Sequence, residues 1–190
     1  LDEQLTLEKD KLFSEVRHNV SEIIKRLFLF KKSKPEVSWE LEKSINHENI
    51  RGSIDLLVKH SDGVGVLDFK RGEFSIPSKS QVDQLLSVQL WFYMHHYIEQ
   101  NQMTKNDALY FGYICLNSPE ISKVFVRDEE IGKMLIQSQF LNSENIILLK
   151  DPFIQRLTEF QELFLRLEKE IFEDRTFPAR PKSKSLCGLC

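Results

Sequence analysis

Asp55, Asp68 and Lys70 lie on two consecutive segments whose composition is typical of β-strands, and Asp62-Gly63 joins those segments. An Asp-Gly pair between two strand-like segments is a strong hairpin signal, because both central positions of a type I′ turn need a positive φ. The sequence therefore predicts a β-hairpin that carries two carboxylates and one ammonium group.

The predicted turn determines which residues face one another. With a two-residue loop at Asp62-Gly63, Asp55 lies opposite Lys70 and Leu57 lies opposite Asp68. Side chains alternate between the faces of a strand, so the two aspartates and the lysine are predicted to emerge on the same face. Opposed side chains come within about 5 Å and diagonal ones within about 7–8 Å, so the three charged groups converge.

Such a cluster suits phosphodiester hydrolysis. A hard cation such as Mg²⁺ or Mn²⁺ prefers oxygen ligands, and two aspartates leave coordination positions for water and a phosphate oxygen. A bound metal lowers the pKa of its water and neutralises developing charge, while a lysine can orient the water or stabilise the same charge. A cross-strand salt bridge would explain Asp55 and Lys70 alone. Asp68 adds a second carboxylate, whose charge a cation would neutralise.

The remaining elements follow from hydrophobic periodicity. Their order is helix, three strands, helix, two strands and further helices, which predicts an α/β fold with a mixed central β-sheet flanked by helices. The predicted helices span about residues 5–30, 80–100, 127–139 and 152–172, and the predicted strands about residues 37–45, 50–59, 64–70, 108–116 and 121–126.

The bulk composition narrows the function classes. The chain has 190 residues, 41% of them hydrophobic, which is enough for one well-buried core and one domain. A formal net charge of -3 excludes a highly basic chromatin-type binder, so any contact with nucleic acid must use local basic patches. We see no membrane-spanning run and no signal peptide, so we expect a cytoplasmic protein without membrane contact. Because Leu1 stands where an initiator Met would, we expect a fragment of a longer chain.

Three sequence pieces, in this order, resemble the signature of the PD-(D/E)xK nuclease superfamily, and in particular its RecB and AddB branch. The family signature consists of a Gly-x-x-Asp strand, an Asp-Tyr-Lys-x-Gly strand and a Gln-x3-Tyr helix. The matching segments cover about the middle third of the chain, and each alone is a weak signal. The resemblance implies a restriction-endonuclease-like nuclease core over residues 1–190. The segments are Gly52-Ser53-Ile54-Asp55, Asp68-Phe69-Lys70-Arg71-Gly72 and Gln89-Leu90-Trp91-Phe92-Tyr93.

The resemblance also implies roles for these residues. Asp55 and Asp68 would bind Mg²⁺ or Mn²⁺ with help from the Phe69 carbonyl, and Lys70 would be the catalytic lysine. Gln89 and Tyr93 would support the site or contact the substrate. The alternative for this last pair is a glutamine at the edge of the core, bonded to backbone, and an ordinary core tyrosine.

Many RecB-like nucleases use a histidine of the N-terminal helix as a metal ligand, and His18 is the corresponding candidate here. The small residues that often precede that histidine are replaced by Glu15-Val16-Arg17. A solvent-facing histidine is the alternative.

The C-terminal tail, residues 175–190, carries Cys187-x2-Cys190. Several relatives hold a 4Fe-4S cluster with one upstream cysteine and three C-terminal ones, and such a cluster needs four thiolates. The upstream cysteine is absent here, and the chain stops at Cys190. Either further ligands lie outside this fragment or there is no cluster, and half of a Zn²⁺ site is an equal possibility. Cys115 lies in an apolar strand and is interpreted as a core thiol.

Candidate phosphate contacts are Arg71 beside the predicted site and the basic residues Lys31 and Lys32, although a solvated surface explains such residues equally well. We predict a metal-dependent DNA nuclease, an exonuclease of repair or recombination, acting on single- or double-stranded DNA with a helicase domain or subunit. Two alternatives are an inactive nuclease fold that binds DNA or scaffolds a complex, and a metal-dependent RNA endonuclease of the same fold.

Overall fold

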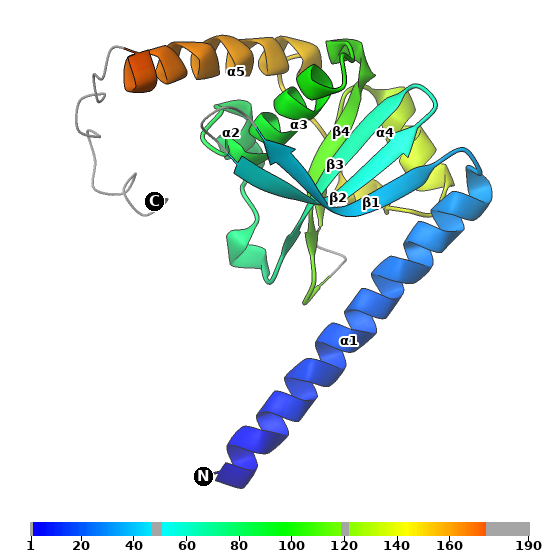
Figure 1. The fold of residues 1–190 in the computed structure, drawn as a ribbon. Coiled ribbons are helices and arrows are strands. Elements are labelled where there is room, and N and C mark those ends of the chain that lie inside the picture. Colours follow the sequence, from blue (N-terminus) through cyan, green and yellow to red (C-terminus); the bar gives the residue numbers. More distant parts are fainter. Residues whose placement is uncertain (1, 47–50, 119–121, 174–190) are drawn as a thin grey trace.

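The computed structural model describes residues 2–46, 51–118 and 122–173. Six strands form one sheet, and helices cover both of its faces (Figure 1). The strands are β1 (Ser38–Asn46), β2 (Arg51–His60), β3 (Gly63–Lys70), β4 (Ala108–Cys115), β5 (Lys123–Val126) and β6 (Ile146–Leu148). The α-helices are α1 (Asp2–Ser33), α2 (Lys79–Asp83), α3 (Gln89–Gln100), α4 (Glu129–Gln137) and α5 (Phe153–Glu168). Shorter helical turns are η1 (Glu73–Ser75), η2 (Lys105–Asp107), η4 (Ser143–Asn145) and the π-helical η5 (Lys169–Glu173).

The strands lie in the sheet in their chain order, β1 to β6. The pairs β1–β2, β2–β3 and β4–β5 are antiparallel, whereas β3–β4 and β5–β6 are parallel. The predicted mixed sheet flanked by helices is therefore confirmed. The sequence did not predict β6, because a strand of three residues is too short to show the alternation of apolar and polar side chains.

Two hydrophobic cores lie on opposite faces of the sheet. The first core joins the sheet to α2, α3 and α5, and the second joins it to α1 and α4. Strand β4 contributes side chains to both cores and is buried along its whole length, as expected for an interior strand covered on both faces.

Helix α1 packs against the sheet only through its C-terminal half, with Ile23, Leu27 and Phe30 in the second core. Its N-terminal half runs past the sheet into solvent (Figure 1), and the Phe13 side chain is exposed there. Across the described residues, every helix is too short or too polar to cross a lipid bilayer.

The predicted hairpin is present, but its register differs by two residues from the prediction. His60 pairs with Gly63, so the two-residue loop is Ser61-Asp62 rather than Asp62-Gly63. Leu57 consequently lies opposite Val66 instead of Asp68. A shift of two residues leaves each side chain of β3 on its predicted face, whereas a shift of one would have moved it to the other face.

Gly63 sets this register. Its φ of +154° is one that side-chain-bearing residues rarely adopt, and a Cβ there would lie 2.2 Å from the Asp107 carbonyl oxygen. Gly63, the second residue of the Asp-Gly pair, is thus a strand residue packed against η2 and not a turn residue. The sequence pattern does not distinguish these two uses of glycine.

Strand β2 does not alternate strictly around Asp55. Ile54 and Leu57 belong to the first core, whereas Leu56 belongs to the second, so the strand changes face at Asp55. In β1, Glu42 adopts a φ of 50° at the same level, between the pairs Leu41–Leu56 and Lys43–Ile54. Asp55 thus lies at a local irregularity of the β1–β2 pair.

The helix predicted over about residues 80–100 is two helices. A capping box at Ser78 starts α2, and the Leu86 and Ser87 amides donate to the Gln81 carbonyl where that helix ends. Leu85 then adopts a φ of 54°, and α3 begins at Gln89. The Leu86 side chain, in the segment between the two helices, is half-exposed. Gln89 therefore lies at the amino end of a helix rather than in its middle.

We expect Gly63→Ala to lower the free energy of unfolding by at least about 1 kcal/mol, because the added Cβ meets the Asp107 carbonyl and the backbone conformation is strained. Gly72→Ala is the matched control: a Cβ there meets no atom within 4 Å, and we expect a change within about 0.5 kcal/mol. Urea denaturation of the two variants measures both values. Equal stabilities would contradict the proposed role of Gly63.

Candidate active site

Asp68 is the most buried charged group of the hairpin, with 3% of its surface exposed. Its Oδ1 accepts a hydrogen bond from Gln89 Nε2 at 2.9 Å. Its Oδ2 lies 2.7 Å from Lys70 Nζ and forms an ion pair with it. This oxygen is buried, and among the described residues Lys70 is the group that engages it. A carboxylate oxygen engaged in this way can still bind a cation.

Gln89 joins three side chains of the site. Its Oε1 accepts from Lys70 Nζ at 3.1 Å, and its Nε2 donates to Asp68 Oδ1 and, at 3.3 Å, to the Tyr93 hydroxyl. The ammonium can only donate, so the amide orientation follows from these partners. The structure therefore brings Asp68, Lys70, Gln89 and Tyr93 into one network, and the alternative of a glutamine bonded to backbone is not what it shows.

Asp55 lies where the pairing of β2 with β3 stops. The last residue pair of the two strands is Leu56–Leu67, and the next residues in that register are Asp55 and Asp68. Asp55 Oδ2 accepts the Phe69 amide hydrogen at 2.7 Å, in place of a backbone carbonyl. In a strand the N–H and C=O of one residue point to the same side. The Phe69 carbonyl therefore also points toward β2, at a level where β2 no longer pairs with it.

The Asp68 carboxyl has a pKa raised above its ordinary value of 3.8. Burial is the largest cause, and the nearby negative charge of Asp55 acts in the same direction. The Lys70 ammonium and the Gln89 amide oppose the shift without cancelling it. Burial therefore disfavours the charged form of Asp68 at this point, and a bound metal ion would favour that form.

Tyr113 and Ser87 also lie at this site, although the sequence did not predict them there. The parallel pairing of β3 with β4 places Tyr113 beside Asp68, and Lys70 Nζ lies 5.5 Å from the centre of the tyrosine ring. The Tyr113 hydroxyl is 2.8 Å from Ser87 Oγ, and burial raises its pKa to about 12. The available signal was the presence of two tyrosines, Tyr110 and Tyr113, in an otherwise apolar strand, since a buried hydroxyl needs a polar partner.

Gly52 explains the first residue of the Gly-x-x-Asp segment. A Cβ at this position would lie 2.8 Å from Tyr93 Cε1. Only glycine lets the tyrosine ring approach β2 this closely, and that ring ends the network that begins at Asp68.

His18 lies on the exposed side of α1. The amide of its neighbour Asn19 donates to the Asn117 carbonyl at 2.8 Å, two residues beyond β4, whose last residue Cys115 pairs with Lys70. This contact places His18 at the same end of the sheet as Lys70. Within the described residues, no hydrogen bond or ion pair joins His18 to Asp55 or Asp68.

The basic candidates do not gather in one place. Arg71 is exposed and directly follows Lys70. Lys31 donates to the Pro35 and Val37 carbonyls and so is engaged in the connection between α1 and β1, next to the exposed Lys32. The Phe30 ring contacts the His60 ring, at the turn end of the hairpin. Asp68 lies five residues along β3 from that end, about 17 Å away.

The cysteines fall into two groups. Cys115 is a free, buried thiol, which confirms the prediction of a core cysteine. Cys187 and Cys190, with the tail predicted at residues 175–190, lie outside the described residues.

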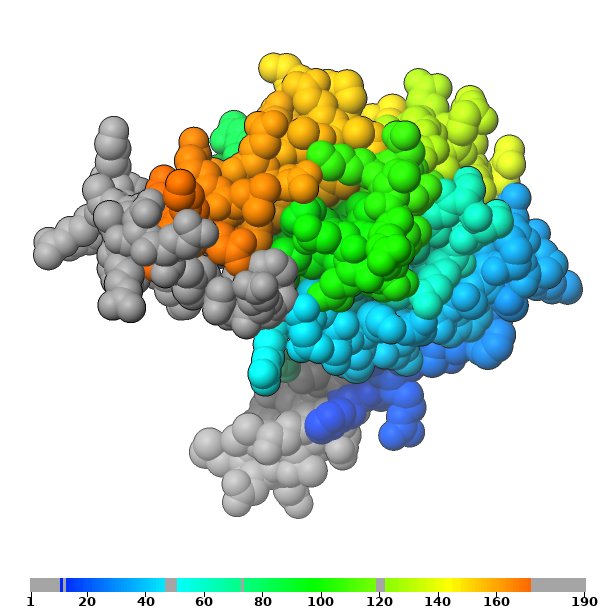
Figure 2. Space-filling view, turned by 45° about the horizontal axis from the view of Figure 1, so that its top comes forward, coloured from blue at the N-terminus to red at the C-terminus, as the bar shows by residue number. Residues whose placement is uncertain are grey.

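A groove of about 370 Å³ begins at the network. It runs between α3 and α5, which pack side by side (Figure 2). Aromatic and aliphatic side chains form most of its surface, and Arg51 is the one cation among its described lining residues. These residues are Arg51, Val88, Gln89, Phe92, Tyr93, Phe160, Leu163, Phe164 and Leu167.

A mixed sheet whose central hairpin ends in two aspartates and a lysine, with a glutamine supplied by the following helix, defines the restriction-endonuclease-like class of nuclease folds. The chain belongs to the PD-(D/E)XK nuclease superfamily, whose family model matches residues 3–190. Searches of the curated proteins and of the solved structures found no significant match. Membership makes a nucleic acid the substrate class and phosphodiester hydrolysis the reaction, for which these nucleases typically use divalent metals such as Mg²⁺.

We expect the stability of the wild type relative to Asp68→Asn to fall as the pH rises above 3.8. The native state holds the Asp68 proton more tightly than the unfolded state, so folding loses this contribution as the pH passes through the raised pKa. Urea denaturation between about pH 4 and about pH 7, in buffer with a chelator, measures the difference. Exposed Glu144→Gln serves as the control. A difference that does not change with pH would contradict the burial argument.

Proposed function

We propose that this chain is a metal-dependent deoxyribonuclease with Asp55, Asp68 and Lys70 as its catalytic residues, and that residues 1–190 form its nuclease domain. The observation that carries the proposal is the network around Asp68. A buried aspartate, its lysine and an orienting glutamine are all in place. An inactive scaffold would have no need to keep a buried carboxylate at a raised pKa.

The aspartates are the proposed metal ligands. Asp68 Oδ2 is buried and, among the described residues, engaged by Lys70 alone, and no hydrogen bond to Asp55 Oδ1 forms within them. With the Phe69 carbonyl these are hard oxygen donors, which suit Mg²⁺ or Mn²⁺. When bound there, a divalent cation supplies the positive charge that polarises a phosphate and a water molecule. We keep His18 as a proposed further ligand because it lies at this end of the sheet.

Lys70 is placed to act on the phosphate. An ammonium has three donors. One is directed at Asp68 and one at Gln89, and the Tyr113 ring lies beside the group. The third donor remains for a phosphate oxygen or the attacking water. Charge placed in advance at the reacting phosphate is among the largest contributions to catalysis.

Gln89 and Tyr93 are proposed as positioning residues. The glutamine holds both the carboxylate and the ammonium, and the tyrosine holds the glutamine. Because α3 begins at Gln89, the positive end of its dipole also lies at the site, where it favours an anionic phosphate.

The substrate strand is proposed to follow the groove between α3 and α5. Phe92 and Tyr93 offer ring surfaces on which an unstacked base can lie, and such stacking tolerates any sequence. Arg51 and Arg71, both exposed, flank the site and would contact phosphates. An apolar groove directly beside the carboxylates favours a single-stranded end of DNA, which supports exonuclease action.

The order of the three motifs supports a more specific proposal for the function of the nuclease. The Gly-x-x-Asp, Asp-x-Lys-x-Gly and Gln-x3-Tyr segments resemble the RecB and AddB branch, so we propose a role in DNA repair or recombination with a helicase domain or subunit. The same resemblance supports a metal site at Cys187 and Cys190, a 4Fe-4S cluster or Zn²⁺, completed by ligands from elsewhere. The main alternative to a DNA substrate is an RNA substrate, and a comparison of the cleavage of DNA and RNA distinguishes the two.

We expect metal-dependent cleavage of labelled DNA, with Asp68→Ala and Lys70→Ala each reducing the rate at least about 100-fold. Gln137→Ala, an exposed glutamine at the end of α4, is the control and should cleave at the wild-type rate. Single-stranded DNA, double-stranded DNA and RNA are compared in Mg²⁺, in Mn²⁺ and in chelator, and the product ladder distinguishes exonuclease from endonuclease. Cleavage that survives either substitution would reject the assigned centre. Cleavage of RNA alone would replace deoxyribonuclease with ribonuclease.

We expect Arg51→Ala to weaken binding of a single-stranded oligonucleotide and to lower the slope of log affinity against log salt by about 1. Arg166→Ala, which removes an exposed arginine from the last turn of α5, is the matched control. Fluorescence anisotropy in chelator measures binding without cleavage. An unchanged salt slope for Arg51→Ala would show that the strand does not follow the groove.

A further inference from the structure

His95, His96 and Glu99 form a second group of potential metal ligands, separate from the hairpin. All three come from α3, and their nearest nitrogen and oxygen atoms lie within 4.8 Å of one another. Within the part of the chain that the structure describes, this is the one place where three such ligand atoms converge. The histidines follow Gln89 by six and seven residues, which places them about 10 Å further along the helix axis.

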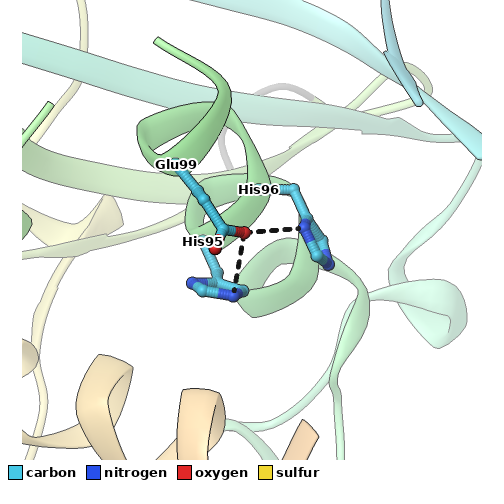
Figure 3. Close-up of side chains that lie close together, drawn as sticks. All are labelled: His95, His96 and Glu99. Atoms are coloured by element: carbon cyan, nitrogen blue, oxygen red, sulfur yellow. Dashed lines mark ion pairs between the residues drawn. The ribbon is translucent and has the colours of Figure 1, made fainter. Parts of the chain in front are cut away.

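The two imidazoles converge on one oxygen atom. His95 Nε2 lies 3.6 Å and His96 Nδ1 3.5 Å from Glu99 Oε2 (Figure 3). These separations exceed the range of about 2.7–3.2 Å for an N–H···O hydrogen bond. Zn²⁺ bonds of about 2.0–2.1 Å in tetrahedral geometry place neighbouring ligand atoms about 3.3 Å apart. The two distances to Glu99 Oε2 are therefore close to those in a metal-ligand set, and all three ligand atoms lie within 4.8 Å of one another.

The surroundings hold the imidazoles in this arrangement. His95 and His96 are 6% and 0% exposed, so solvent does not account for them. The Phe92 and Phe164 rings lie 4.3 Å and 4.9 Å from the His96 ring. The Glu99 side chain, in contrast, is 56% exposed. The cluster thus has rigid, buried nitrogen ligands and an open carboxylate side through which an ion can enter.

From this geometry we infer that His95, His96 and Glu99 bind a transition-metal ion of the Zn²⁺ class. Two imidazoles and one carboxylate suit Zn²⁺, Ni²⁺ or Co²⁺, whereas Mg²⁺ prefers a set of oxygen ligands. The three side chains leave a fourth position for water. Because all three ligands belong to α3, the ion would stabilise the C-terminal turns of that helix, whose residues Gln89 and Tyr93 belong to the nuclease centre. The inference does not depend on the proposed nuclease activity.

The test measures Zn²⁺ binding directly. Chelator-stripped protein carrying Cys187→Ser and Cys190→Ser, which removes the competing thiols, is titrated against a chromophoric chelator. We expect one Zn²⁺ per chain, and we expect Glu99→Gln to weaken binding at least about tenfold. Glu99 is exposed, so its substitution leaves the core intact. Exposed Glu162→Gln on α5 is the matched control and should bind as the parent does.

The hairpin carboxylates need a separate control. Asp55→Asn combined with Asp68→Asn should leave the high-affinity Zn²⁺ unchanged. Three outcomes would overturn the inference: no Zn²⁺ bound by the chain that lacks Cys187 and Cys190, equal affinity in Glu99→Gln, or loss of Zn²⁺ when only the two aspartates are replaced.

Discussion

The rest of the site depends on the burial of one carboxylate. Asp68 lies inside a sheet made of valine, leucine and phenylalanine side chains, where an isolated negative charge is strongly disfavoured. Lys70 and Gln89 compensate for that burial only in part, and the raised pKa of Asp68 is the measure of the remainder. At this position the buried carboxylate lowers the stability of the fold and serves its function, as is common for catalytic residues.

The three groups that surround the Asp68 charge come from different secondary-structure elements. Lys70 is supplied by the same strand, Gln89 by the first turn of α3, and the Tyr113 ring by the neighbouring parallel strand. The Tyr113 ring and α3 pack in the same hydrophobic core, the first one, so the strand and the helix fix each other's position. The site is therefore positioned by rigid elements, which suits a centre that must hold charged groups at fixed separations.

The sequence predicted the fold class because it follows from local patterns: period-two strands and helical periodicity are visible in a single chain. Gln89 and Tyr93 were placed near Asp68 by the resemblance to the nuclease family. The hairpin register and the break before α3 were not predicted, since Gly63 is constrained by its close approach to Asp107, and Leu85 adopts a positive φ that the helical pattern does not reveal. Tyr113 was missed because only strand pairing places it near Lys70.

The order of the strands has a consequence for how this domain can change over evolutionary time. The network is drawn from β2, β3, α3 and β4, so β5, β6 and α4 contribute no side chain to it. Selection on that edge of the sheet acts only through packing, where hydrophobic exchanges of similar volume are tolerated. The far edge can therefore diverge or be remodelled for a new neighbour while the chemistry stays fixed, as though the sheet had one half under functional constraint and one half free to drift.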